Sequence, residues 1–179
     1  MKRIVSVVLA AGAAIVLSAA SAQAQVSIGV GGGLSIPLGD FGDAAKTGWN
    51  LLANVGYNTP TGLGVRGDFF YGQHNFKGGI DAKWKLAGGL ANVLYNFQGA
   101  GAVTPYVIGT VGVMNLKADG GGGASASESK LTFGGGGGIK FKAGSDSHIF
   151  AEARYLTINT SGSNANFIPI SVGVSFGFK

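Results

Sequence analysis

From residue 26 onward, apolar side chains alternate with small or polar ones in almost every segment of the chain. The C-terminal stretch FIPISVGVSFGFK, residues 167–179, shows the pattern most clearly. Its apolar members are Ile168, Ile170, Val172, Val174, Phe176 and Phe178. Alternation with a period of two residues is typical of β-strands whose two faces meet different surroundings. No uninterrupted apolar run after residue 25 is long enough for a membrane-spanning helix, so this chain could cross a membrane only as a closed β-barrel.

The alternating segments predict an all-β chain with eight strands. They lie near residues 26–36, 48–57, 63–72, 80–97, 104–117, 130–142, 148–158 and 167–179. In most of them one face is clearly apolar. In the fifth segment the facing stays open, because Val107 and Val111 on one face oppose Tyr106 and Ile108 on the other.

The predicted connections alternate in length. Those after the second, fourth and sixth segments are short, with the sequences NTPTG, QGAGAV and AGSDS. Longer loops are expected near residues 37–47, 73–80, 117–130 and 159–166. This asymmetry is typical of an up-and-down antiparallel barrel in the outer membrane, with tight periplasmic turns, longer outside loops and both termini on the periplasmic side. The glycine run 120–123 and the Ala-Ser repeat that follows are expected to be mobile.

The first residues have the features of a secretory signal peptide. Lys2 and Arg3 precede an apolar run, and Ala22-Gln23-Ala24 supplies a small-residue cleavage site. We therefore expect residues 1–24 to be removed, which leaves a barrel domain of residues 25–179 and lowers the formal net charge from +5 to +3, because two basic residues are lost. The remaining basic residues are scattered, which argues against nucleic-acid binding. Without cysteine, the chain has no disulfide framework.

Alternation alone does not say whether the apolar faces meet lipid or a protein interior. A soluble eight-stranded barrel also alternates, with its apolar residues pointing inward. The polar face of such a barrel meets water and carries many long charged side chains. Here the polar face consists mostly of Gly, Ser, Asn and Thr, which suits the narrow inside of a small membrane barrel. The sequence favours lipid on the apolar face, and a soluble periplasmic lipocalin-like ligand carrier is the alternative.

Aromatic residues gather near the predicted strand ends. Those next to the short turns are Tyr57, Tyr95, Phe97, Phe141, Phe176 and Phe178, and those toward the other ends are Trp49 and Tyr71. Membrane barrels carry two girdles of aromatic residues at the two lipid–water interfaces. We interpret these eight residues as such girdles.

Several charged residues fall on the predicted inward face. Arg66 and Asp68 are two residues apart, as are Glu152 and Arg154, so each pair shares one face of its strand. A Lys or Arg on the lipid face near the midplane would cost about 2 to 4 kcal/mol. Charges inside a barrel must instead be paired. The predicted interior polar network comprises Arg66, Asp68, Glu152, Arg154, Lys140 and Asn54.

Taken together, these features resemble a known group, the small eight-stranded outer-membrane β-barrel proteins of Gram-negative bacteria. The chain is similar to the transmembrane domain of outer-membrane protein A and its short surface-antigen relatives. The resemblance rests on the A-Q-A site, GGGLSIPLGDFGDAAKTGW, ANVLYNF, TPYVIGTVGV and the aromatic last strand. It implies export to the bacterial outer membrane, contact with its lipid, and insertion by the barrel-assembly machinery, which reads a terminal aromatic residue. Here Phe178 is followed by Lys179, a departure from that pattern.

For function, the sequence favours a non-enzymatic barrel with a structural or surface role. Its loops would contact external partners, and the sequence does not identify them. A narrow ion-conducting pore is the second hypothesis, because Gly134, Gly136 and Gly138 leave the inward face of one strand without side chains. Eight strands otherwise leave an interior just wide enough for side chains.

An enzyme is the third hypothesis. His74 and His148 are the two histidines, and both are interpreted as solvated loop residues rather than catalytic bases. No cofactor or metal site is predicted, since two histidines without cysteine make a poor zinc site. The glycine run 134–138 lacks the Lys-Ser/Thr that a phosphate-binding loop requires.

Overall fold

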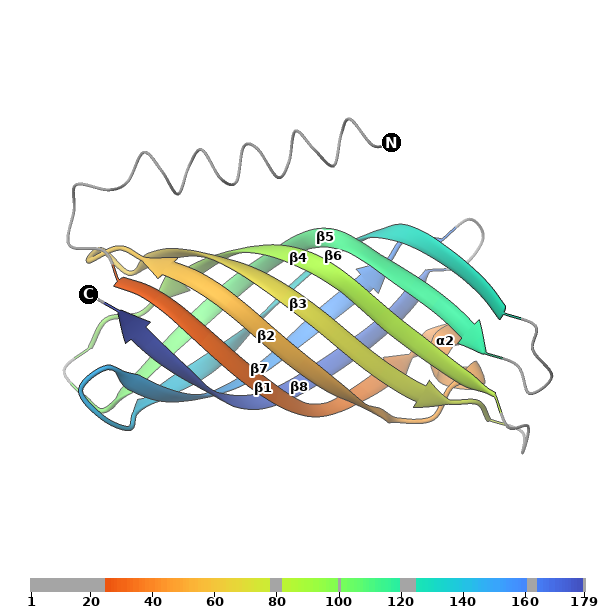
Figure 1. Ribbon diagram of the computed structural model, residues 1–179, viewed down its shortest axis with the longest axis horizontal. Helices are drawn as coiled ribbons and strands as arrows, with labels where there is room; N and C mark the ends of the chain where they lie inside the picture. Colours follow the sequence, from red (N-terminus) through yellow and green to blue (C-terminus); the bar gives the residue numbers. More distant parts are fainter. Residues whose placement is uncertain (1–24, 78–81, 100, 120–124, 161–163, 179) are drawn as a thin grey trace.

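The computed structural model describes residues 25–77, 82–99, 101–119, 125–160 and 164–178. They form a closed barrel of eight antiparallel strands in which each strand pairs with its neighbour in sequence and β1 pairs with β8 (Figure 1). The strands are β1 (Gln25–Leu38), β2 (Gly48–Asn58), β3 (Leu63–Asn75), β4 (Lys83–Asn96), β5 (Val103–Asp119), β6 (Ser125–Lys142), β7 (Ser147–Ile158) and β8 (Ala165–Phe178). The predicted all-β, up-and-down barrel is confirmed. The predicted signal peptide lies outside the described residues.

The two ends of the barrel differ. β1 begins and β8 ends at one end, where Val26 pairs with both Tyr57 and Phe178, and the short turns lie at this end too (Figure 1). We call it the terminal end. The β2–β3 turn there closes tightly because Gly62 adopts a φ of 90°, which favours glycine. The opposite end carries a short helix, and we call it the helix end.

That helix, α2 (Gly39–Ala44), was not anticipated, because the sequence predicts a loop over residues 37–47. The strand β1 stops where Gly39 takes a φ of 56°, and an isolated bridge between Ala45 and Phe76 restarts the pairing. The helix lies across the mouth of the barrel and directs Phe41 inward, where it is 7% exposed. Among the described residues no helix has the length and hydropathy that a membrane-spanning helix needs.

The long β5–β6 hairpin is a second difference. A loop is expected over residues 117–130, yet the strands continue to Asp119 and resume at Ser125, and these two residues pair with each other. The low-complexity stretch 127–129 is therefore strand, because its backbone pairs with residues 115–117 and the Asn115 amide donates to the hydroxyls of Ser127 and Ser129. The prediction of a loop is therefore wrong for the described part of this segment. Residues 120–124 lie outside the described residues.

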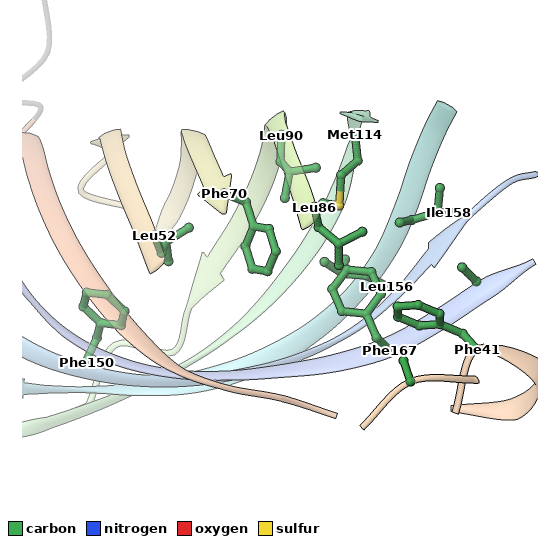
Figure 2. Close-up of a cluster of buried hydrophobic side chains, with 12 residues drawn as sticks. Phe41, Leu52, Phe70, Leu86, Leu90, Met114, Phe150, Leu156, Ile158 and Phe167 are labelled. Carbon is green, nitrogen blue, oxygen red and sulfur yellow. The ribbon is translucent and has the colours of Figure 1, made fainter. Parts of the chain in front are cut away.

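The interior is divided into a polar and an apolar half. The expectation of a mainly polar inward face holds toward the terminal end and is wrong toward the helix end. There a continuous cluster of buried hydrophobic side chains fills the barrel (Figure 2). Toward the helix end it comprises Phe41, Ala45, Leu52, Phe70, Leu86, Leu90, Met114, Leu156, Ile158, Ala165 and Phe167, whereas its remaining member, Phe150, lies on the terminal side of the barrel. Alternation indicates which residues point inward, but those residues need not be polar when they can pack against one another.

Candidate functional site

The outer surface of the barrel is a broad apolar band. Large hydrophobic side chains on every strand are exposed, as the alternation predicts, among them Val30, Leu51, Phe69, Val93, Val111, Leu131, Tyr155 and Val172. The facing of β5, which the sequence leaves open, is now fixed: Val107, Val111 and Val113 are exposed, whereas Tyr106 and Ile108 are buried. A contiguous apolar band of this extent on a soluble protein would drive aggregation. It is suited to contact with lipid.

The aromatic residues of the predicted girdles lie on this outer surface. Six of them are exposed, namely Trp49, Tyr95, Phe97, Phe141, Phe176 and Phe178, while Tyr57 and Tyr71 are half-buried. At the helix end, the rings of Trp49 and Tyr71 lie 5.4 Å apart between centroids. At the terminal end, Tyr95 and Phe97 contact edge to face at 5.2 Å.

Four buried charged residues meet in the middle of the barrel. Arg66 Nε lies 2.7 Å from Asp68 Oδ1, and Arg66 Nη1 lies 2.9 Å from Glu152 Oε2. Arg154 completes the ring, with Nη1 2.9 Å from Asp68 Oδ2 and Nε 3.0 Å from Glu152 Oε1. Each arginine thus contacts both carboxylates, one from β3 and one from β7. We call these four residues the central ion network. Two positive charges balance two negative ones, which offsets the cost of burying them.

Neutral residues that the sequence did not single out extend this network. The hydroxyl of Tyr106 donates to Glu152 Oε2 at 2.8 Å. Asn92 Oδ1 accepts hydrogen bonds from Thr110 at 2.6 Å and from Arg154 Nη1 at 3.3 Å. Tyr106 and Thr110 belong to the strand whose facing was undecided, so the pattern carried no signal for them.

Lys140 and Asn54, the other two residues of the predicted network, are not ion-paired with it. Lys140 Nζ donates to Asn96 Oδ1 at 2.7 Å and lies 4.9 Å from the centroid of the Tyr106 ring. Asn54 is buried, and its side chain forms no hydrogen bond to another described residue. Both lie on the terminal side of the central ion network, beside Arg66.

The interpretation of His74 as a solvated loop residue is wrong. It is fully buried near the helix end of β3, where its Nδ1 donates to the carbonyl oxygen of Lys46 at 3.0 Å. Phe41 of α2 packs edge-on against the ring, with centroids 5.3 Å apart. The helix that covers this mouth of the barrel was not predicted, and so neither was the burial beneath it. His148 is half-buried in β7, near its first residue.

Within the described ranges, no group of three or more His, Cys, Asp or Glu side chains could hold a metal ion. The buried carboxylates of the central ion network are both engaged with arginines. What the arrangement supports is a closed, lipid-facing barrel with an ion-paired and apolar interior.

An eight-stranded barrel that is apolar outside and ion-paired inside defines a small transmembrane β-barrel. The chain belongs to the family of the outer membrane protein beta-barrel domain, whose model matches residues 7–178. This membership supports a location in the bacterial outer membrane. No curated protein sequence shows significant similarity to the chain.

Solved structures of other small barrels share this fold. Neisserial surface protein A (NspA) superposes with a TM-score of 0.68 at 18% identity, over 87% of this chain and 97% of its own. Ail, the attachment invasion locus protein of Yersinia pestis, in complex with the heparin analogue sucrose octasulfate, gives 0.60 at 20% identity, over 87% and 99%. A major outer membrane protein from Thermus thermophilus gives 0.61 at 12% identity, over 87% and 100%. At these identities the likeness concerns the fold.

Proposed function

We propose that the protein is a non-enzymatic, structural barrel of the outer membrane whose helix end faces the outside. The observation that carries this proposal is the filled interior. The central ion network spans the barrel from β3 to β7. All members of the apolar cluster except Phe150 lie in the half toward α2 (Figure 2). A barrel packed in this way is stable in lipid without a bound ligand. Any contact with external partners must then be made by its surface.

The same packing argues against the narrow ion-conducting pore. Gly134, Gly136 and Gly138 do lack side chains, but neighbouring groups occupy the space beside them. Leu156 packs at Gly134, the Arg154 backbone at Gly136 and the Tyr106 ring at Gly138. An ion would have to displace the four arginine–carboxylate contacts of the central ion network and then pass the buried apolar side chains toward α2. We therefore expect no stepwise currents from the refolded protein in a planar bilayer, and regular unitary steps would revive the pore hypothesis.

A soluble carrier is disfavoured for a separate reason. A lipocalin-like protein points its apolar residues toward a central ligand, whereas here Phe69, Val93 and Val172 point outward and are all more than half exposed. The inward apolar residues toward α2 pack on one another rather than around a central ligand. Partition of the expressed protein into detergent rather than into periplasmic extract tests this distinction.

Binding of an external polyanion is a second candidate, and a group of partly exposed lysines favours it. Lys85 and Lys117 are paired across β4 and β5 beyond the apolar band, and Lys83 is paired with Asp119 in the same place. Asp119 lies 2.6 Å from Lys85 Nζ and 3.1 Å from Lys117 Nζ, so one carboxylate is shared by two ammonium groups beside a third lysine. The Ail structure holds a heparin analogue. Retention of the protein on heparin, and its loss in Lys83→Gln/Lys117→Gln, would support this role. Equal retention of both proteins would exclude it.

We also propose that export and insertion follow the route of other outer-membrane barrels. Cleavage after Ala24 would leave Gln25, the first residue of β1, at the N-terminus. The outward aromatic residues Phe176 and Phe178 end the last strand, where they support recognition by the barrel-assembly machinery. N-terminal sequencing of the protein from outer membranes should begin at Gln25. A sequence beginning at Met1 would contradict cleavage.

A further inference from the structure

A small cavity lies inside the barrel on the terminal side of the central ion network. Its volume is about 20 Å³, which exceeds the roughly 10–15 Å³ that one water-sized occupant requires. The polar side chains that line it come from five different strands. They are Ser27, Asn54, Asn58, Arg66, Lys140 and Ser175.

The charge around this cavity is not balanced within the described part of the chain. Arg66 and Arg154 are neutralised by Asp68 and Glu152. Lys140, which lines the cavity, has no carboxylate within ion-pair distance among the described residues, and its Nζ is held by the neutral amide oxygen of Asn96 and the face of Tyr106. The charged groups around the cavity therefore sum to one excess positive charge, which is the ammonium group of Lys140 in the cavity wall. A half-buried ammonium group without a counter-ion is costly in a low-dielectric setting.

The other lining groups have hydrogen-bond donors to spare. The side chains of Ser27, Asn54 and Ser175 form no hydrogen bond to any other residue in the described ranges. Asn58 uses its Oδ1 to accept from Asn96, so its Nδ2 hydrogens are left over. Hydroxyl and amide groups gathered around an ammonium group offer donors to a negative ion. The carboxylates of Asp68 and Glu152, in contrast, are paired with the arginines.

We propose that this cavity is a binding site for one small monovalent anion of the halide class, held by Lys140 with the help of Asn54, Asn58 and the two serines. The size of the cavity admits one chloride or bromide ion and excludes a large organic anion. The anion neutralises the excess charge of Lys140 and accepts the unused hydrogen bonds. Because Asn58 in the cavity wall is the last residue of β2, the ion enters from the side of the short turns. Its role is structural: it completes the charge balance of the interior.

A bromide-soaked crystal of the intact protein tests the position of the ion. Bromide scatters anomalously, so an anomalous difference peak within about 3.5 Å of Lys140 Nζ is expected. A cavity that holds density without an anomalous signal contains water, and that result would overturn the proposal. This measurement uses the wild-type protein and does not depend on whether a variant folds.

A titration tests the energetic role of Lys140. The unfolding midpoint of the refolded protein is followed as gluconate is replaced by chloride at constant ionic strength. A ligand that binds only the folded state raises the midpoint with concentration. The wild type should show this rise, and Lys140→Met should weaken the apparent affinity at least about tenfold, the loss expected for one charge-assisted contact. Lys142→Met, an exposed residue on the same strand, is the matched control and should respond like wild type. Equal chloride responses of wild type and Lys140→Met would refute the site.

Discussion

Arg154 on β7 contacts Asp68 on β3 across the barrel, with Nη1 2.9 Å from Oδ2. In a ring of eight strands these two are four places apart in either direction, so the contact joins opposite walls. Arg66 and Glu152 make the reciprocal contact at 2.9 Å. Together the two bridges tie the sheet to itself where backbone pairing cannot, because the ladder connects only adjacent strands.

Removal of one residue of the central ion network should therefore destabilise the folded barrel strongly. In Arg154→Leu, the two buried carboxylates of Asp68 and Glu152 share a single arginine, Arg66. Loss of one partner of a buried ion pair lowers the free energy of unfolding by about 3 to 5 kcal/mol. Lys142→Leu, an exposed residue, serves as the control. The two variants are compared with wild type by urea unfolding in detergent. An unfolding midpoint of Arg154→Leu equal to that of wild type would show that the network does not stabilise the barrel.

Truncation of an aromatic side chain on β3 should destabilise the barrel strongly only on the inward face, where the apolar cluster lies. Phe70 is fully buried inside the barrel and packs against Phe167 with ring centroids 6.0 Å apart, whereas its neighbour Phe69 is 59% exposed on the outside. Phe70→Ala is expected to cost about 3 to 5 kcal/mol of unfolding free energy, because it opens a cavity. Phe69→Ala opens none and should cost clearly less. Equal losses for the two variants would contradict the assignment of the faces.

A charged residue on the outer apolar band should destabilise the barrel more the closer it lies to the middle of the bilayer. Val172 lies in the middle of β8 and is 55% exposed, whereas Phe178 ends the strand. In a bilayer, Val172→Arg should cost about 2 to 4 kcal/mol, while Phe178→Arg should lose at most about 1 kcal/mol to charge burial. Reversible unfolding from liposomes measures both. Equal losses of unfolding free energy at the two positions would contradict the assignment of Val172 to the middle of the bilayer and of Phe178 to its edge.

Adjacent glycines on β4 provide a test of interior packing. A Cβ at Gly88 would overlap the carbonyl oxygen of Val113 on β5, whereas a Cβ at Gly89 would meet no atom within 4 Å. Gly88→Ala should thus lower the refolding yield or the unfolding midpoint, because backbone must shift. Gly89→Ala should behave like wild type. The comparison fails if both variants refold equally well.

Much of the fold could be predicted because alternation is a local property. In β8 each residue from Ile168 to Phe178 reports its own face, and the outward facing of Val172 and Val174 follows directly. The same logic placed Arg66 and Arg154 on inward faces. It could not say which strands oppose each other across the interior, since that depends on closure of the whole sheet.

Where the local signal is weak, prediction failed for physical reasons. The helix α2 is six residues long, too short for a helical period to be recognised. The outer parts of β5 and β6 are strands because of backbone pairing, as between Lys117 and Ser127, and their side chains give no alternating apolar pattern. The burial of His74 follows from α2 above it, and so could not be predicted without that helix.

The central claim is that the apolar faces of this closed barrel meet lipid. The most direct measurement is to fractionate expressing cells and to run the outer-membrane fraction on a gel, boiled and unboiled. We predict that the protein is found in this fraction and migrates faster when unboiled, because a closed barrel in detergent stays compact. Release with the periplasm, in a form that needs no detergent and migrates identically in both lanes, would contradict the account.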